Sequence, residues 1–189
     1  MSTSAESPWA QARLRDGAMA ALRAVPYDDP VARELVARVQ QEYVDRYGGP
    51  DEAAVDPAEF VSPAGLFLVA EVDGVPAGCG AWRRHTGTPP AQDPDPAVAE
   101  VKRVYVEPAF RRRGLAQVLV AALEDSARRA GYRSVVLNSG DRQPEAIALY
   151  EGLGYGPVAG YGIYAGEPGA VFLGKRLSGP ADETEERAS

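Results

Sequence analysis

The stretch VYVEPAFRRRGLAQVLVAAL, residues 104–123, decides how this sequence folds. It reads as the end of a β-strand, a loop with three arginines, and a helix whose apolar residues recur on one face. The first N–H groups of a helix lack partners inside the helix, and the positive end of the helix dipole favours anions there. Gly114 lets the backbone approach a phosphate closely. The stretch therefore predicts an anion site at residues 111–116, although a solvated basic turn is the alternative.

The composition is that of one soluble globular domain. The chain has 189 residues and a net charge of −7, which argues against a general nucleic-acid binder, although a local basic loop still attracts an anion. The chain has one cysteine, Cys79, and one histidine, His85. These counts exclude a disulfide framework within the chain and a His-rich metal site. The sequence shows neither a secretory signal nor a long apolar run. We therefore expect a cytoplasmic protein that needs no metal and does not bind a membrane. The sequence leaves open whether the protein forms a homodimer.

The rest of the chain predicts alternating strands and helices in a single domain over residues 17–177. Residues 1–16 are expected to be mobile, and the acidic tail 178–189 to be disordered. Asp29, Pro30 and Gly48 mark the ends of one helix, and Asp73-Gly74 is typical of a tight hairpin turn. The predicted strands fall within residues 20–27, 65–72, 75–85, 97–106, 132–139, 155–164 and 169–177; the predicted helices are 29–47, 114–131 and 143–154.

Three motifs resemble the GNAT superfamily of N-acetyltransferases. RRRGLA, residues 111–116, is similar to its pyrophosphate loop, Gln/Arg-x-x-Gly-x-Gly/Ala; PEAIALYEGLGY, 144–155, resembles a later helix, and AEVKRVYVEP, 99–108, its fourth strand. The resemblance covers roughly residues 19–177. Within the superfamily, the chain resembles a branch of small bacterial N-acetyltransferases. Gln143 and Ala116 depart from the family pattern. The implied fold is α/β (mixed α+β), with a largely antiparallel twisted sheet of six or seven strands, flanked by helices and splayed between strands four and five.

The resemblance also implies acetyl-CoA as the acyl donor. Backbone amides of residues 112–116 would hold its diphosphate, and the exposed edge of the fourth strand would pair with its pantetheine arm. An amide near Val106 would polarise the thioester carbonyl. The residues implied to bind the cofactor are Val104, Tyr105, Val106, Arg111, Arg112, Arg113, Gly114, Leu115, Ala116, Gln117, Asn138 and Gln143.

Two residues take catalytic roles by their family positions. Glu100 lies 11 positions before Arg111 and is expected to accept a proton from the attacking amine, directly or through water. Its alternative is an ion pair with Lys102 or Arg103, and Glu71 is a weaker candidate for the base. Tyr150 is expected to protonate the departing thiolate, and its alternative is a place in the core.

The remaining reactive side chains receive lesser roles. Cys79 lies among small residues in a predicted strand, so we expect an inert buried thiol and direct attack in a ternary complex. His85 is expected at the surface, and its alternative is a substrate contact or a second candidate for the base. Family topology allows five residues to line the acceptor pocket, with packing as the alternative for the aromatic ones: Trp82, Arg83, Arg84, Tyr161 and Tyr164.

The sequence therefore predicts an acetyl-CoA-dependent N-acetyltransferase acting on a primary amine of a small molecule or peptide. An acidic chain favours a cationic acceptor, whereas Arg83 and Arg84, if they face the pocket, favour one that carries a carboxylate. Both options stay open. A non-catalytic acyl-CoA-binding or regulatory module on the same fold is an alternative function. Binding of a nucleotide phosphate is a third.

Overall fold

A computed structural model describes residues 10–87 and 97–177. The predicted disordered tail, the proline-rich residues 88–96 and the first nine residues of the predicted mobile segment lie outside the described residues. None of the helices in the two described ranges is both long and apolar enough to span a bilayer. Nor do His, Cys, Asp and Glu side chains gather in these ranges in a group that could hold a metal ion.

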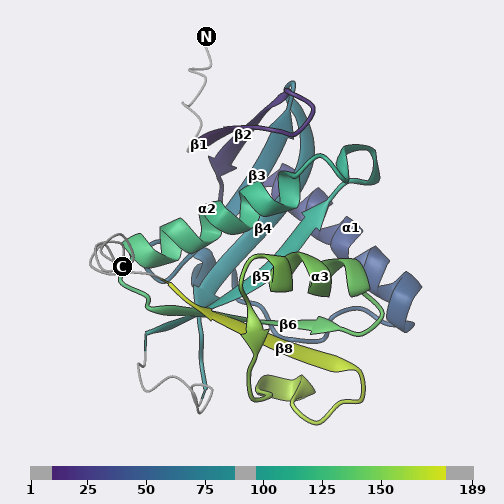
Figure 1. Ribbon diagram of the computed structural model, residues 1–189, viewed down its shortest axis with the longest axis vertical. Coiled ribbons are helices and arrows are strands. Elements are labelled where there is room, and N and C mark those ends of the chain that lie inside the picture. Colours follow the sequence, from purple (N-terminus) through teal and green to yellow (C-terminus); the bar gives the residue numbers. More distant parts are fainter. Residues whose placement is uncertain (1–9, 88–96, 178–189) are drawn as a thin grey trace, which may run out of the picture.

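A single twisted sheet of eight strands runs through the molecule in the order β1-β2-β3-β4-β5-β6-β8-β7 (Figure 1). Neighbouring strands are antiparallel except for β5 and β6, which are parallel. The strands are β1 (Ala10–Arg13), β2 (Met19–Ala24), β3 (Gly65–Val72), β4 (Val75–Arg84), β5 (Val98–Val106), β6 (Ser134–Gly140), β7 (Gly156–Pro157) and β8 (Ala170–Arg176).

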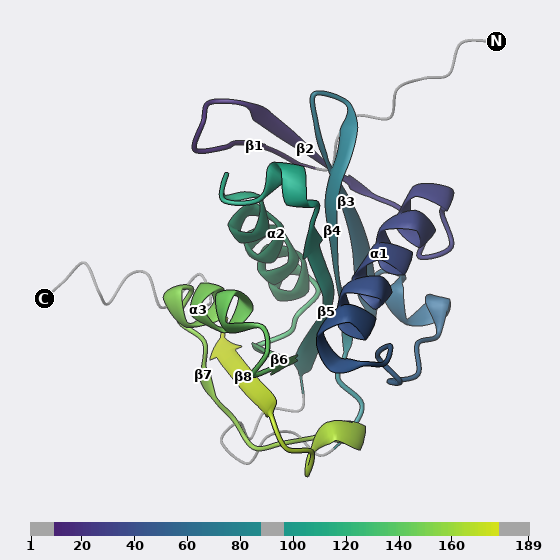
Figure 2. The same ribbon diagram turned by 90° about the vertical axis from the view of Figure 1, so that its right-hand side faces the viewer.

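Three helices cover the two faces of this sheet (Figure 2). Helix α1 (Pro30–Tyr47) lies on one face, and α2 (Leu115–Arg129) and α3 (Pro144–Gly152) lie on the other. The ends of α1 are those that the sequence predicts, because the Asp29 side chain accepts hydrogen bonds from Val31 and Ala32 N–H and Gly48 adopts a φ of 82°. Short 3-10 helices occupy Pro57–Phe60, Pro108–Phe110 and Gly162–Tyr164.

Apolar side chains form one core layer on each face of the sheet. Leu35 and Val39 of α1 pack with Phe67 on one face, while Leu119 and Leu123 of α2 pack on the other. Trp82 belongs to the α2 layer. It is 1% exposed, and its indole N–H donates to Ser126 Oγ at 3.1 Å. Trp82 is therefore a core residue, and the expectation that it lines the acceptor pocket is wrong.

Strands β5 and β6 separate along their length, as the predicted splay requires. Their parallel ladder, as far as the described residues show, pairs only Val98–Glu100 with Ser134–Val136. The remainder of β5 keeps its pairing with β4, so its other edge is open toward α3. A β-bulge lies within this part, at a register shift opposite Cys79–Ala81, where Arg103 has a φ of 57°. The Arg103 side chain at this bulge pairs with Asp51.

Two strands differ from the sequence prediction. Residues 1–16 were assigned no element, yet Ala10–Arg13 forms β1 and pairs with Met19–Leu22. Residues 155–164 were expected to be one strand, but only Gly156–Pro157 pairs with β8, and Gly162–Tyr164 is a 3-10 turn. Pro157 has no N–H to donate, and glycine weakens a strand, which explains the short pairing.

Candidate active site

A cleft of about 450 Å³ opens between the free edge of β5, helix α1, the N-terminal end of α2 and helix α3. We call it the central cleft. It brings together most of the residues that the sequence assigns to the cofactor, and it also receives Tyr150. The predicted residues that line it are Val104, Tyr105, Val106, Arg111, Arg112, Gly114, Leu115, Ala116, Gln117, Gln143 and Tyr150.

The loop at residues 111–116, which we call the arginine loop, presents unpaired backbone donors. The first helical hydrogen bond of α2 runs from Val118 N–H to Gly114 O at 3.1 Å. In the described part of the chain, no acceptor takes a hydrogen bond from the N–H groups of residues 112–117. Arg112 and Gly114 have positive φ angles, 63° and 89°. The loop thus offers a row of amides with space for an anion, and these residues fit the diphosphate of acetyl-CoA.

The three arginines of the loop have different surroundings. Arg111 donates to Glu42 Oε2 and to Val106 O, both at 2.9 Å. Arg113 pairs with Asp16 and, unlike its two neighbours, does not line the central cleft. For Arg112, the described residues supply no ion-pair partner, and the residue lines the cleft. Only Arg112 among the three thus keeps its full charge for a ligand.

The open edge of β5 carries a backbone donor toward the central cleft. Glu107 N–H donates to Ala77 O, on the β4 side, at 2.9 Å. Because successive N–H groups of a strand point to opposite edges, the N–H of Val106 points to the open edge. Val104, Tyr105 and Val106 line the cleft there. This edge can pair with an extended ligand and can donate to a carbonyl oxygen.

Tyr150 of α3 lies at the wall of the central cleft. Its side chain is 7% exposed and packs edge-to-face on Tyr155, with the ring centroids 5.4 Å apart. Burial raises the pKa of the Tyr150 phenol, because a buried phenolate loses its hydration. The side chain is therefore a protonated phenol at neutral pH. Tyr150 is also a member of the buried core, which is the alternative that the sequence offered, so its role as an acid remains a prediction.

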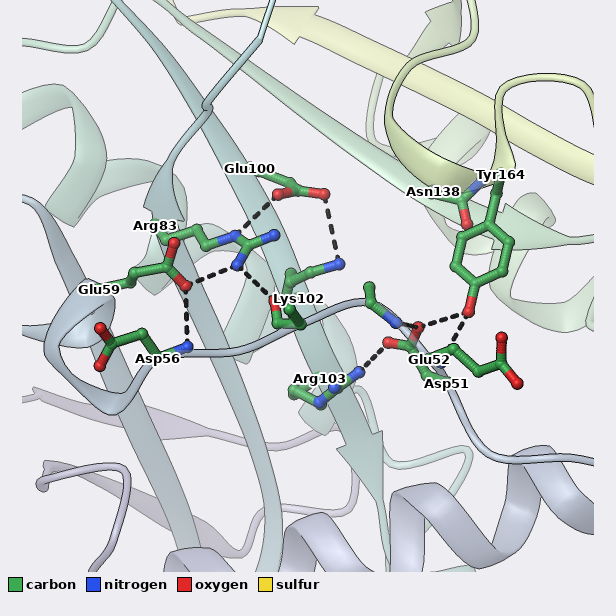
Figure 3. A network of polar contacts seen from close by, with 12 residues as sticks. Asp51, Glu52, Asp56, Glu59, Arg83, Glu100, Lys102, Arg103, Asn138 and Tyr164 are labelled. Atoms are coloured by element: carbon green, nitrogen blue, oxygen red, sulfur yellow. Dashed lines mark hydrogen bonds and ion pairs between the residues drawn. The ribbon is translucent and has the colours of Figure 1, made fainter.

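Glu100 is buried in an ion-pair cluster instead of the central cleft (Figure 3). The residue is 5% exposed; Arg83 Nε lies 2.9 Å from its Oε2, and Lys102 Nζ lies 3.3 Å from its Oε1. The pairing with Lys102 that the sequence offered as an alternative is thus present. Arg103 instead pairs with Asp51. Glu100 is not among the residues that line the cleft, so its role as a base remains a prediction.

The cluster around Glu100 extends into a polar network that joins β4, β5 and the loop after α1 (Figure 3). Arg83 also contacts Glu59 Oε2 at 2.6 Å, and the Tyr164 hydroxyl donates to Asp51 Oδ1 at 2.9 Å. The Asn138 side chain donates to Val171 O at 3.4 Å, and Asn138 does not line the central cleft. Glu59 and Glu100 both pair with the Arg83 guanidinium and neutralise its charge, so Arg83 does not attract an acceptor carboxylate.

Arg84, His85 and Tyr161 make their contacts away from the central cleft. Arg84 Nε donates to the Tyr132 hydroxyl at 3.1 Å, beside a second cavity apart from the central cleft. The rings of His85 and Tyr161 meet edge-to-face at 4.6 Å, and no described group bonds either nitrogen of His85. Burial, and then the charge of Glu100, raise the pKa of Tyr161. The surroundings of Arg83 and Arg84 therefore give no support to an acceptor with a carboxylate.

The remaining candidates behave as inert or structural groups. Cys79 is fully buried, its thiol donates to Arg103 O at 3.3 Å, and burial raises the pKa of that thiol. A thiol in this state is a poor nucleophile, as the sequence predicts. Glu71 forms an ion pair with Arg23 at 2.6 Å and lies outside the central cleft.

Sequence reasoning missed part of the cleft wall. Helix α1 contributes Val39, Glu42 and Tyr43, none of which the sequence assigns to the site. Tyr43 lies close enough to Arg103 and Asp51 for their charges to influence its pKa, so it links the cleft to the polar network. The remaining missed residues are Arg15, Phe110, Glu145, Ala146 and Leu149. Their shared wall follows from tertiary packing, although Glu145, Ala146 and Leu149 belong to a motif identified in the sequence.

Comparisons with known proteins agree on one family. The model described as "Acetyltransferase (GNAT) family" matches residues 33–155. An "IAA acetyltransferase" of Azospirillum brasilense is 31% identical over 155 residues, which cover 82% of this chain and 95% of that protein.

Solved structures share the fold. The GNAT domain of S. lividans PAT superposes with a TM-score of 0.68 at 24% identity, covering 93% of this chain and 100% of that one. A GNAT family acetyltransferase from Elizabethkingia anophelis, solved with acetyl-CoA bound, superposes with a TM-score of 0.57 at 15% identity, covering 84% of this chain and 98% of that one.

Proposed function

The chain belongs to the GNAT family of acetyltransferases and is an acetyl-CoA-dependent N-acetyltransferase, and we propose that it acetylates a primary amine by direct attack in a ternary complex. The acceptor is a small molecule or a peptide. One observation carries the proposal. The central cleft joins the unpaired N–H groups at Gly114, the open edge of β5 and the protonated phenol of Tyr150.

Binding depends mainly on the backbone. The N–H groups of residues 112–116 would hold the diphosphate, and Gln117 and Gln143 line the same wall. Val104, Tyr105 and Val106 would pair with the extended pantetheine arm, as an added strand does at an open sheet edge. Because Arg111 and Arg113 are tied to Glu42 and Asp16, their role in this account is to fix the loop.

Acetyl-CoA supplies an acetyl group that is activated as a thioester. The Val106 N–H at the open edge of β5 would stabilise negative charge on the carbonyl oxygen, and this electrostatic contribution is usually the largest in acyl transfer. Tyr150 would donate its phenolic proton to the departing sulfur. Because its pKa is raised, the phenol is still protonated when the carbon–sulfur bond breaks.

The attacking amine must first lose a proton, because an alkylamine has a pKa near ~10. We assign this step to Glu100, acting through a water molecule, since the carboxylate lies outside the central cleft. Its contact with Lys102, at 3.3 Å, is longer than its 2.9 Å contact with Arg83. Turning the Lys102 side chain away would free Oε1 to accept the proton. Cys79 takes no part.

A thiol-release assay with acetyl-CoA across amines, amino acids and peptides tests the reaction. We expect Tyr150→Phe and Glu100→Gln each to lower kcat by about 10²–10⁴-fold, the usual contribution of a positioned acid or base, with little change in the Kd for acetyl-CoA. Full turnover in either variant would contradict that residue's role. Calorimetry that detects acetyl-CoA binding, with no thiol released for any acceptor, would contradict the transferase and support a binding module.

Assembly and location remain predictions. We propose that the protein works in the cytoplasm, with its single cysteine as the support. We also propose that it binds neither nucleic acid nor a membrane, with its net charge of −7 as the support. Light scattering on the purified chain, with and without acetyl-CoA, distinguishes a monomer from a homodimer. A stable complex with duplex DNA at moderate salt would contradict the expectation about nucleic acid.

A further inference from the structure

We propose that Arg15, in the turn between β1 and β2, is a ligand of the diphosphate of acetyl-CoA. The inference rests on the proposed function, and it extends the cofactor site to a hairpin that the arginine loop does not include. No motif identified in the sequence contains Arg15, which falls in the segment expected to be mobile. Its assignment comes from contacts between the turn and the loop.

The β1–β2 turn is fastened to the arginine loop. The N–H of Arg15 donates to Arg113 O at 3.0 Å, and the side chain of Asp16 pairs with that of Arg113. These two contacts join residues about 100 positions apart in the chain. Figure 2 shows the tip of the hairpin beside the segment that leads into α2. The hairpin is thus held where its turn can reach a ligand of the loop.

The Arg15 side chain lies over Gly114. A Cβ built on Gly114 would meet Arg15 Cγ at 3.4 Å, Nε at 3.5 Å and Cδ at 3.7 Å. Arg15 also lines the central cleft, and its Nη2 donates to Gln117 Oε1 at 2.7 Å. A guanidinium has five N–H donors, so this one contact orients the group and leaves donors for an anion at the same amides.

Arg15 differs from Arg111 and Arg113 because no carboxylate of the described residues neutralises its charge. The guanidinium of Arg111 is paired with Glu42, and that of Arg113 is paired with Asp16. The contact of Arg15 is with a neutral amide oxygen, and no carboxylate of the described residues pairs with it. Arg15 and Arg112 therefore bring net positive charge to the cleft wall, and Arg15 does so directly above the glycine of the loop. Arginine also suits bidentate recognition of phosphate oxygens.

Calorimetric titration of the full chain with acetyl-CoA tests the assignment. We expect Arg15→Ala to raise the Kd about tenfold, as loss of a charge-assisted hydrogen bond does, and Arg15→Lys to recover part of the affinity. The control is Arg129→Ala, which removes a charge from the opposite end of α2 and should leave the Kd unchanged. In turnover, Arg15→Ala should raise the KM for acetyl-CoA and leave kcat unaltered.

Dephospho-CoA identifies the phosphate involved, because it keeps the diphosphate and lacks the 3′-phosphate. The same loss of affinity with dephospho-CoA supports the diphosphate. A loss confined to acetyl-CoA, or equal affinities of Arg15→Ala and wild type, would overturn the inference. Wild type that binds no acetyl-CoA would instead overturn the proposed function. Thermal melts without ligand should agree within a few degrees for wild type and Arg15→Ala, and a large drop would assign Arg15 to folding instead.

Discussion

Replacing Gly114 with alanine tests the anion-binding geometry of the arginine loop. Gly114 precedes α2 with a φ of 89° and lines the central cleft. Alanine there has two separate effects, because the backbone angle disfavours any L side chain and the new methyl group lies beside the unpaired amides. The first effect acts on folding, and the second acts on cofactor binding.

Both effects can be estimated from the structure. A left-handed conformation costs a residue other than glycine about 1–2 kcal/mol. For a chain of this size each kcal/mol lowers Tm by about 2–4 °C, so a drop of about 2–8 °C is expected. In the unliganded protein the nearest atom to the new Cβ is Arg15 Cγ at 3.4 Å, on a flexible side chain, so steric strain adds little. Loss of one hydrogen bond to the charged diphosphate, about 1.5–3 kcal/mol, weakens acetyl-CoA binding about 10–150-fold.

Gly131→Ala is the matched control. Gly131 follows the other end of α2 with a φ of 93°, and an added Cβ there meets no atom within 4 Å. Differential scanning calorimetry should show similar Tm losses for the two variants. Titration with acetyl-CoA should show a weaker Kd for Gly114→Ala alone. If both variants bind acetyl-CoA like wild type, the amides around Gly114 do not hold the diphosphate, and the central argument for this site is wrong.

Two further predictions concern stability and chemistry. Burial raises the pKa of Tyr43 to about 12 and also raises that of Tyr150, so the folded chain keeps protons that the unfolded chain loses above pH ~10. Urea titrations should therefore show a constant contribution below pH ~10 that falls as the pH rises toward 12; a constant stability from pH 9 to 11 would contradict it. Cys79→Ala should keep wild-type kcat and lose about 1 kcal/mol of stability. Failure to turn over while folded would indicate an acyl-cysteine route.

Local signals in the sequence were sufficient for the elements that frame the site. Asp29 and Gly48 bound α1 because one side chain caps its first N–H groups and the other residue adopts a left-handed φ. Asp73 and Gly74 have φ angles of 52° and 76°, as the predicted tight turn requires. The spacing of RRRGLA placed the unpaired amides. Each of these signals depends on residues that are close together in the sequence.

Features set by tertiary contacts were not predictable in the same way. Strand β1 has four residues and depends on β2 for its pairing, so no apolar run indicates it. The bulge places Arg103 at a φ of 57°, a conformation that its sequence does not suggest. The partner of Glu100 could have been found, because the register of β4 and β5 sets Arg83 directly opposite it. Pairing the predicted strands before assigning the base would have identified that contact.

The three arginines of the loop look equivalent in the sequence and are not equivalent in the fold. Arg111 connects the loop to α1 through Glu42, and Arg113 connects it to the β1–β2 turn through Asp16. Each of these ion pairs holds the loop in place and neutralises the positive charge of one arginine. The net attraction for an anion then comes from the backbone amides, from Arg112 and from Arg15, a residue distant in the sequence. Substituting Arg111 or Arg113 should therefore disturb the geometry of the loop more than its charge, whereas Arg15 can be removed with the loop itself intact.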